Sequence, residues 1–230
     1  MTAVFVLATG NADKAREIGE ILGDAAGGPV EVAPVAVGGR TAAYVLAPHG
    51  EMREVVGRLT VPDAPPSVEE TGETIEENAR IKAAGWSGAL DLPAIADDTG
   101  LEVDALGGEP GVHSARYAGE AATYAENVAK LLAAMDGVGA GRRACRFVTV
   151  ALARFPDGRE VMARGTVEGS VAEAPRGVSG FGYDAVFVPD EGDGRTFGEM
   201  SAAEKHAVSH RGRALRDLAV SLGAGLGAGV

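Results

Sequence analysis

The chain has 230 residues, of which 46% are hydrophobic, 23% are charged and 5% are aromatic. This composition is typical of a folded globular protein with a sizeable core and excludes a disordered chain. The formal net charge of −12 at pH 7 argues against sequence-independent binding to nucleic acid or to anionic lipid. Both of these partners require a surplus of Lys and Arg on one surface, so we expect neither of them.

Cys145 is the single cysteine of the chain. It cannot form a disulfide within the chain or join other cysteines in a zinc site, which predicts a cytoplasmic protein. The surrounding sequence, RACRFVTVALA, is typical of a buried strand and favours a structural thiol over a nucleophile. We expect no signal peptide or membrane span at the start of the sequence, because its apolar run is too short.

The first elements of the chain are predicted to be a strand, a turn and a helix. Residues 3–8 are apolar, residues 9–11 read ThrGlyAsn, and the apolar residues of the segment 14–22 recur at helical spacing. Free backbone N–H groups at the start of this helix and the ammonium of Lys14 form an anion site in outline. An ordinary strand-to-helix turn with a solvated lysine explains the same residues equally well.

Three further helices are predicted from capping boxes, in which a hydroxyl and a glutamate three residues later satisfy free backbone N–H groups. The pairs are Thr74 with Glu77, Thr123 with Glu126, and Ser201 with Glu204. Each pair precedes a stretch that is compatible with a helix, so these are the expected helix starts.

The second half of the chain adds strands and one more helix. Residues 145–155 and 159–168 flank ProAspGly, which predicts an antiparallel hairpin. Residues 186–188 predict another strand, and the apolar stripe of residues 214–222 predicts a last helix. Strands and helices therefore interleave, which predicts an α/β fold with a mixed sheet.

Residues 27–68 are rich in Gly, Pro and Ala, with a weakly amphipathic piece at residues 51–59. This segment is predicted to be either an inserted arm or an extra hairpin and helix. The last residues of the sequence, GAGLGAGV, are expected to fray.

Asp97 and Asp98 follow the apolar run of residues 92–96, so they are predicted to lie at the end of a buried strand. Adjacent carboxylates repel each other, and burial of a carboxylate is costly unless a cation or hydrogen bonds compensate. Hard oxygen ligands at the end of a sheet strand suit Mg²⁺. The alternative is that one of them is an N-cap or turn aspartate before ThrGly.

The stretch EETGETIEENARIKA, at residues 69–83, contains a second group of acids. Glu69 and Glu70 precede the capping box and are not needed by it. Lys82 lies four residues after Asn78 on the same helix face, so both side chains are able to meet one ligand. Exposed pairs at this spacing are common, so the pattern alone is weak.

Two later motifs combine an aromatic residue with cations. Phe181 lies between glycines in GFGYDAVF, where it either stacks on a flat ligand or packs on the core. His210 and Arg211 lie at the edge of the last predicted helix, and Lys205 precedes them. Each of these three residues is equally well explained as a solvated surface group.

Taken together and in order, five stretches resemble the family of inosine/xanthosine triphosphate pyrophosphatases. They are LATGNADK at 7–14, EETGETIEENARIKA at 69–83, ADDTGLEVDALGGEPGVHSARYAG at 96–119, GFGYDAVF at 180–187 and MSAAEKHAVSHRGRAL at 200–215. The sequence departs from the family pattern at Thr99, where serine is usual, at Ala185, where proline is usual, and at His206, where asparagine is commoner. That family degrades non-standard purine nucleoside triphosphates to the monophosphate and pyrophosphate.

The resemblance implies a two-lobed α/β protein whose mixed sheet is flanked by helices, with the active site in a cleft between the lobes. It implies a single catalytic domain at residues 1–222, an inserted arm at about 27–66 and a flexible tail at 223–230. Members are commonly homodimers, so we expect a homodimer here.

The resemblance also implies roles for individual residues. The catalytic residues would be Asp98, Asp97 and Lys14, and Mg²⁺ would be bound by Glu69 and Asp98, with Glu70 in support. The triphosphate would be held by Thr9, Gly10, Asn11 and Lys14. Further nucleotide contacts would come from Lys82, Thr99, Phe181, Gly182, Tyr183, Asp184, Lys205, His210 and Arg211.

Arg211, aided by His210, would then recognise the base. A guanidinium only donates hydrogen bonds, so it favours the 6-oxo acceptor of hypoxanthine or xanthine over the 6-amino group of adenine. Two alternatives remain open at this point. One is a related pyrophosphatase for modified pyrimidine nucleotides, and the other is a non-catalytic nucleotide-binding protein in which the arm docks a partner.

Overall fold

The computed structural model of the chain describes residues 4–66 and 68–226. The strands are β1 (Phe5–Leu7), β2 (Val30–Val37), β3 (Arg40–Pro48), β4 (Ala94–Val103), β5 (Pro110–Gly111), β6 (Ala144–Arg154), β7 (Glu160–Val171) and β8 (Phe187–Pro189). The α-helices are α1 (Ala12–Ala26), α2 (Met52–Arg58), α3 (Ile75–Leu90), α4 (Tyr124–Ala134), α5 (Ala202–Val208) and α6 (His210–Leu226).

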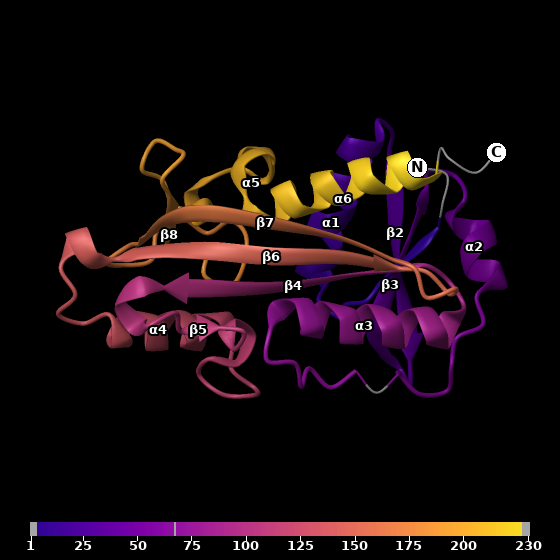
Figure 1. Ribbon diagram of the computed structural model, residues 1–230, viewed down its shortest axis with the longest axis horizontal. Helices are drawn as coiled ribbons and strands as arrows, with labels where there is room; N and C mark the ends of the chain where they lie inside the picture. Colours follow the sequence, from indigo (N-terminus) through magenta and orange to yellow (C-terminus); the bar gives the residue numbers. More distant parts are fainter. Residues whose placement is uncertain (1–3, 67, 227–230) are drawn as a thin grey trace. The chain divides into compact units, whose positions relative to one another are not determined.

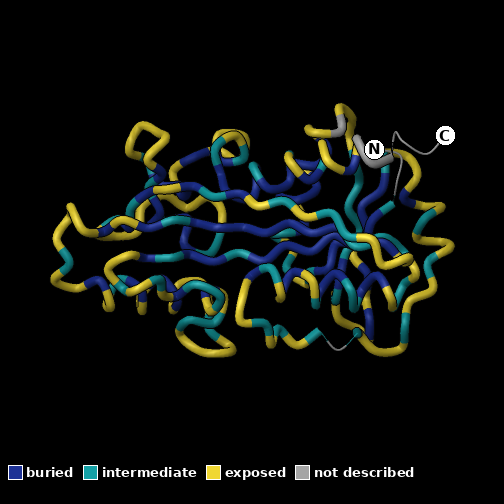
Figure 2. The backbone as a smooth tube through the Cα atoms, in the orientation of Figure 1, coloured by how far each residue is buried: buried dark blue, intermediate teal, exposed yellow. Residues whose placement is uncertain are grey.

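In the described residues, eight strands form one sheet in the order β2-β3-β1-β4-β6-β7-β8, with β5 beside β4 (Figure 1). Strand β1 pairs antiparallel with β3 and parallel with β4, so the sheet is mixed. The prediction of an α/β fold with a mixed sheet flanked by helices is confirmed. Figure 2 shows that the middle strands β4 and β6 are buried along most of their length.

The described chain divides into two compact units. The first contains the described residues up to Asp98, residues 150–164 and the chain from Ala214 onward, and the second contains residues 99–149 and 165–213. Strands β4, β6 and β7 each contribute residues to both units. The single catalytic domain of residues 1–222 stays a prediction.

The core of the first unit is built largely by α1, α6 and the strands. Buried apolar side chains recur at helical spacing on both helices, at Ala15, Ile18, Ile21, Leu22, Ala214, Leu215, Leu218 and Leu222. Gly19 allows α1 to approach β2 closely, because a Cβ atom there would lie 2.5 Å from Cγ2 of Val32. The helix therefore packs on the sheet with little room for a larger residue.

Residues 27–66 form the β2–β3 hairpin and α2, so the alternative of an extra hairpin and helix is confirmed. Gly38 and Gly39 form the hairpin turn with positive φ angles of 58° and 80°, which glycine adopts without strain. Strand β3 also pairs with β1, for example through Val45 and Val6. The segment is thus part of the sheet, while its status as an insertion stays a prediction.

The core of the second unit includes the one cysteine of the chain. Cys145 is fully buried and packs with residues of β4, β6 and β8 and with the α4 side chains Val128 and Leu131. Burial raises the pKa of its thiol to about 12. The prediction of a buried structural thiol is confirmed.

All three predicted capping boxes are present, with Thr74, Thr123 and Ser201 as N-cap residues of α3, α4 and α5. A fourth box, formed by Thr196 and Glu199, caps a short 3₁₀ helix at Phe197–Glu199. The sequence analysis missed this box, because no helical apolar pattern follows it.

The position of Asp97 and Asp98 corrects the sequence prediction. Both residues lie inside β4, which continues to Val103, and not at the end of a strand. Gly100 makes the continuation possible, because a Cβ atom there would lie 2.9 Å from the carbonyl oxygen of Gly111 in β5. Residues 99–100, ThrGly, therefore lie within β4, where Gly100 closely approaches β5. The alternative of a turn or N-cap aspartate before ThrGly is wrong.

The remaining elements agree with the predictions within a few residues. The predicted hairpin is formed by β6 and β7, the predicted strand at 186–188 is β8, and the amphipathic piece at 51–59 is α2. Helix α6 continues to Leu226, so the first part of the predicted flexible tail is helical. The rest of that tail lies outside the described residues. Among the described residues, the search for a helix able to cross a membrane finds none.

Candidate active site

Asp97 and Asp98 are adjacent in β4, but each pairs with a lysine from a different helix. Asp97 Oδ2 lies 3.3 Å from Nζ of Lys14 in α1, and Asp98 Oδ1 lies 2.9 Å from Nζ of Lys82 in α3. Successive side chains of a strand point to opposite faces of the sheet. The two carboxylates therefore face apart, and each has an ammonium that offsets the cost of its burial.

Lys82 is the centre of this charged cluster in the first unit. It is 8% exposed, and its ammonium donates to the backbone oxygen of Asp97 at 2.8 Å and to Oδ1 of Asp98 at 2.9 Å. Oε1 of Glu70 lies 3.5 Å from the same nitrogen. Burial acts to lower the pKa of Lys82, but Asp98, Glu70 and Asp97 outweigh it and hold the pKa above its usual value. The lysine is therefore a fixed cation.

Asp98 retains an oxygen for a further partner. Burial raises the pKa of this carboxyl above its usual value, and Lys82 and Lys14 offset only part of that effect. Its Oδ2 atom is buried and has no hydrogen-bond partner among the described residues. A buried carboxylate oxygen in this state fits a cation or a water molecule that arrives with a ligand.

The acids predicted to share a metal are not assembled by the structure. Glu69 is exposed, and in the described chain its side chain forms neither an ion pair nor a hydrogen bond, whereas Glu70 lies beside Lys82. No group of three His, Cys, Asp or Glu residues in the described chain is placed to hold a metal ion. Asp98 thus fits the role of one metal ligand. Of the two glutamates, Glu70 is the one that lies in the same charged cluster.

The turn before α1 uses several of its own N–H groups. Oδ1 of Asn11 accepts from the backbone nitrogens of Asp13 at 2.9 Å and Lys14 at 3.2 Å, and Oγ1 of Thr9 accepts from the nitrogen of Asn11 at 3.1 Å. These groups were predicted to be available for phosphate, but Asn11 caps the helix with them. The exposed Gly10 backbone and the Lys14 ammonium remain at this turn as candidate phosphate donors.

The second unit contains a cluster around the GFGYD motif. Oδ2 of Asp184 accepts from the backbone nitrogen of Phe181 at 2.8 Å and from Nζ of Lys205 at 2.7 Å. Asp184 and Lys205 are only 3% and 5% exposed, so this ion pair is shielded from solvent. Gly180 has a φ of 71° and leaves no room for a Cβ beside Asp184. The motif therefore holds the Phe181 backbone and the lysine in a defined geometry.

The ring of Phe181 is surrounded by cations and by a second ring. Nζ of Lys205 lies 4.9 Å from the ring centroid, and Cζ of Arg211 lies 5.5 Å from it. The ring of Tyr124 lies 5.8 Å away at an interplanar angle of 35°. Both cations are within the range of cation–π attraction, so the partly exposed Phe181 helps to position them.

Arg211 and His210, at the start of α6, have different environments. Arg211 is 2% exposed, and its Nη2 donates to Oγ1 of Thr99 at 3.2 Å. That oxygen also lies 2.6 Å from Oγ1 of Thr149. The ring of His210 stacks on Phe147, with 4.3 Å between the ring centroids and an angle of 22°. Arg211 therefore lies between Thr99 and the ring of Phe181, while His210 packs on the core.

The family model of the Ham1 family matches residues 5–221 of the chain. The chain belongs to the Ham1 family. A relative from Symbiobacterium thermophilum, named dITP/XTP pyrophosphatase, is 54% identical over 162 residues, which are 70% of this chain and 79% of that protein. A relative of the same name from Methylococcus capsulatus is 43% identical over 224 residues, 96% of this chain and 97% of that protein.

Solved structures of the Ham1 family agree with this fold. The structure of a HAM1 protein from Coxiella burnetii matches with a TM-score of 0.70 and 35% identity, over 94% of this chain and 96% of that one. The Ham1 protein of Staphylococcus aureus matches with a TM-score of 0.68 and 33% identity, over 95% and 97% of the two chains. The resemblance found in the sequence is confirmed.

Two of the predicted nucleotide contacts have structural roles in this Ham1 chain. Tyr183 is 4% exposed and its hydroxyl donates to the carbonyl oxygen of Ser114 at 2.9 Å. Burial raises the pKa of this hydroxyl above its usual value, so it stays protonated. Gly182, with a φ of 63°, lies beside an apolar cavity of about 390 Å³ next to α4.

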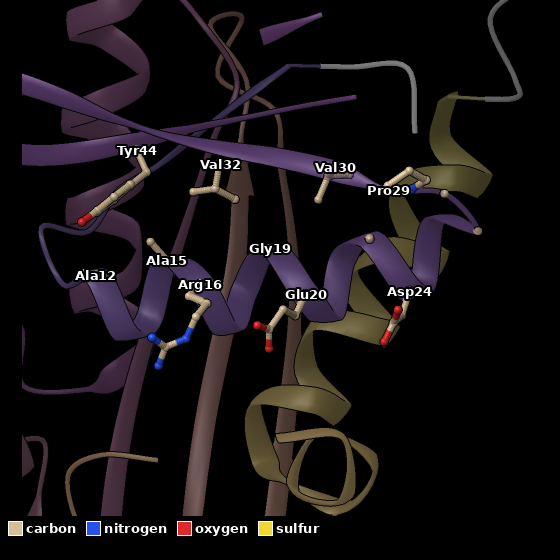
Figure 3. Close-up of a pocket in the computed structure, with 13 residues that line it drawn as sticks. Ala12, Ala15, Arg16, Gly19, Glu20, Asp24, Pro29, Val30, Val32 and Tyr44 are labelled. Atoms are coloured by element: carbon tan, nitrogen blue, oxygen red, sulfur yellow. The ribbon is translucent and has the colours of Figure 1, made fainter. Parts of the chain in front are cut away.

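A larger pocket in this Ham1 chain, of about 790 Å³, runs beside the contact of α1 with β2 and is lined by residues of both elements and by Tyr44 of β3 (Figure 3). Ala15, Gly19 and Val32 are among the residues that line it, and Arg16 and Glu20 extend along its α1 side. None of the predicted site residues is among its lining residues. Volume alone therefore does not locate the candidate active site.

Sequence reasoning missed two residues that the structure brings to the two clusters, Tyr124 and Thr149, and it predicted a different role for a third, Asn78. Asn78 binds the loop that carries Glu70, Tyr124 packs on Phe181, and Thr149 contacts Thr99. The helical spacing of Asn78 and Lys82 was the one signal in the sequence for this group. Tyr124 and Thr149 are far in sequence from their partners, so no local pattern identifies them.

Proposed function

We propose that this Ham1 chain hydrolyses dITP, ITP and XTP to the nucleoside monophosphate and pyrophosphate. The observation that carries the proposal is Asp98, a buried carboxylate that is held by Lys82 and keeps one oxygen without a partner among the described residues. The names of relatives that match nearly the whole chain support the substrate class.

Asp98 is proposed to orient or deprotonate the attacking water. Hydrolysis breaks the bond between the α- and β-phosphates, and the water supplies the new P–O bond while its proton passes to a base. Lys82 holds this carboxylate in place, and Lys14 offers positive charge to the phosphate oxygens.

Mg²⁺ is proposed as the cofactor, with Asp98 and Glu69 as predicted ligands and Glu70 as the acid that lies nearer in the structure. The unpartnered Oδ2 of Asp98 is the feature of this chain that fits a metal. When bound, Mg²⁺ would neutralise negative charge on the phosphate oxygens. Lys82 carries out part of the same neutralisation from the protein side.

The base is proposed to lie on Phe181, with Arg211 and Lys205 at its edge. A guanidinium offers only donors, so Arg211 favours a base with a 6-oxo acceptor and disfavours adenine. Asp184 holds Phe181 and Lys205 in place by accepting a hydrogen bond from the backbone nitrogen of the first and from the ammonium of the second. His210 is proposed to act indirectly, through its stacking on Phe147.

The test is the release of pyrophosphate from equal concentrations of dITP, ITP, XTP, ATP and GTP, each with and without Mg²⁺. We expect release that depends on Mg²⁺ and is restricted to the first three nucleotides. Release from modified pyrimidine nucleotides alone would contradict the purine assignment. Binding of ITP without any release would instead indicate a non-catalytic nucleotide-binding protein.

The assembly and the location of the protein are part of the same proposal. We propose a homodimer in the cytoplasm, where the free nucleotide pool lies and where the thiol of Cys145 stays reduced. Light scattering at micromolar concentration tests the assembly directly. A monomer mass across that range would contradict the dimer while leaving the proposed hydrolysis intact.

A further inference from the structure

The loop that carries Glu69 and Glu70 is attached to the start of α3 by a set of short hydrogen bonds. The backbone nitrogen of Gly72 donates to Oδ1 of Asn78 at 2.9 Å. The nitrogen of Glu73 donates to Oε2 of Glu77 at 2.8 Å. The loop is thus fixed to the helix at Gly72 and at Glu73, and the bond to Asn78 is the nearer of the two to Glu70.

Gly72 lies directly on the helix. A Cβ atom at this position would lie 2.7 Å from Oδ1 of Asn78 and 2.7 Å from Cβ of Glu77. Both separations are too short for a real side chain, so only glycine allows this contact without movement of the loop. Asn78 itself is fully buried, which excludes a role as a solvated surface amide.

Asn78 and Lys82 are one helical turn apart on α3. Lys82 contacts Glu70 at 3.5 Å and Asp98 at 2.9 Å, while Asn78 holds the loop from which Glu70 projects. One helix therefore determines both the position of the fixed cation and the position of the acidic loop. A change in the Asn78 contact would alter the distance from Glu70 to Lys82 without altering Lys82 itself.

The choice of asparagine has a physical reason. The side-chain oxygen of Asn78 accepts the hydrogen bond from the nitrogen of Gly72. The other polar atom of this side chain, Nδ2, is buried and has no partner among the described residues. An unpartnered buried N–H costs stability, and such costs are retained mainly at functional sites. Aspartate would accept the same hydrogen bond but would add negative charge near Glu70 and Asp98. Asparagine is the uncharged acceptor of the same shape.

We infer that Asn78 is a positioning residue, which holds the loop of Glu69 and Glu70 against α3 so that Glu70 faces Lys82. This inference rests on the proposed function for its chemical purpose. The contact itself rests on the hydrogen bond, the burial and the glycine geometry, which do not depend on any activity.

Hydrogen exchange tests the contact without any assay of activity. Asn78→Ala is compared with Asn78→Asp, which keeps the acceptor, and with Ser87→Ala. Ser87 is a matched control because it is also buried on α3 and also has a side-chain atom without a partner among the described residues. We expect amide exchange in residues 68–74 to be about fivefold faster in Asn78→Ala, the effect of one lost hydrogen bond, and unchanged in the other two.

Equal exchange in Asn78→Ala and the wild-type protein would overturn the inference. If Asn78→Ala does not fold, Gly72→Ala replaces it, because the added Cβ pushes the loop off the helix without altering the core. Faster exchange in Gly72→Ala supports the inference, and unchanged exchange contradicts it.

Binding of Mn²⁺ alone, measured from the signal of the free ion in electron paramagnetic resonance, tests the purpose of the contact. We expect Asn78→Ala to weaken binding about tenfold, as the loss of an outer-shell partner typically does. Its kcat for XTP should fall while KM changes less than twofold, and Ser87→Ala should match the wild-type protein. Unchanged Mn²⁺ binding and kcat in a variant with a loosened loop would overturn the positioning role.

A wild-type protein that releases no pyrophosphate would refute the proposed function instead. The hydrogen-exchange result would still show whether Asn78 holds the loop.

Discussion

The charged cluster of the first unit and the aromatic cluster of the second unit both bury charged groups, but they compensate for burial in different ways. In the first, each lysine faces a carboxylate, as in Lys14 with Asp97 and Lys82 with Asp98. In the second, Lys205 and Arg211 lie over the ring of Phe181, and Lys205 is also paired with Asp184.

This difference suggests what each cluster is suited to bind. The first cluster offers a carboxylate oxygen without a partner among the described residues, and it keeps fixed cations for negative charge. Such a set suits phosphate, a metal ion and an attacking water. The second cluster offers a ring and a guanidinium, which suit a flat ligand with hydrogen-bond acceptors at its edge. Burial of charge alone would not have distinguished these two uses.

The largest expected effect breaks the first cluster. Asp98→Asn keeps the shape of the side chain but removes the base, so the rate of pyrophosphate release from XTP should fall roughly 10³-fold or more. The variant should still fold and retain some nucleotide binding, because Lys82 can still donate to the amide oxygen. A near-wild-type rate in a folded sample would remove Asp98 from the mechanism.

The second prediction addresses selectivity in the second cluster. Arg211→Lys keeps the charge but loses the planar set of donors, so the preference of kcat/KM for ITP over ATP should fall about 100-fold. Arg213→Lys is the matched control on the same helix, since Arg213 contacts Glu191 and the backbone of Thr166. Equal losses in both variants would show that the effect is structural and not one of base recognition.

A smaller effect is expected for the ring itself. Phe181→Leu removes the stacking surface, so KM for ITP should rise about tenfold while kcat changes little. Phe155→Leu is the control, because Phe155 also carries a cation over its ring, Arg159 at 4.6 Å, but belongs to the core of the first unit. A fall in kcat without a rise in KM would contradict stacking as the role of Phe181.

The smallest expected difference concerns the stability of the two units. Trp86 is buried in the first unit and Cys145 in the second, so fluorescence and thiol labelling report on them separately. Cys145 is fully buried, and burial raises the pKa of its thiol to about 12, so native protein should label very slowly.

In urea, the fluorescence transition of Trp86 and the labelling transition of Cys145 should coincide. Strands β4, β6 and β7 each have residues in both units, so we expect one cooperative unfolding transition. Two separate midpoints would show that the units unfold independently.

The helix starts could be predicted from the sequence because their chemistry is local. Thr74, Thr123 and Ser201 each act on backbone groups within three residues, and all three boxes are present. The course of β4 could not be predicted in this way. Its continuation past ThrGly depends on the contact of Gly100 with Gly111, and this contact exists only in the folded chain.

Some residues of the candidate site could likewise be predicted from the sequence, while the arrangement of others could not. The identities of Lys14, Asp98 and Arg211 followed from motifs, but the choice between Glu69 and Glu70 did not. These two acids are adjacent in a loop, and the hydrogen bond between Gly72 and Asn78 determines which of them faces Lys82. The hydrogen bond from the hydroxyl of Tyr183 to the carbonyl oxygen of Ser114 could not be predicted either, because the two residues are far apart in sequence, and the role of Tyr183 in the nucleotide site stays a prediction.

The alternation of side chains along β4 limits how the sequence of this strand can change. Asp97 and Asp98 serve helices α1 and α3 because they face opposite sides, and Thr99 faces the same side as Asp97. A substitution affects one of these partnerships at a time. Insertion or deletion of a single residue before Asp97 would instead turn every later side chain to the wrong face. The length of this stretch is therefore expected to be fixed.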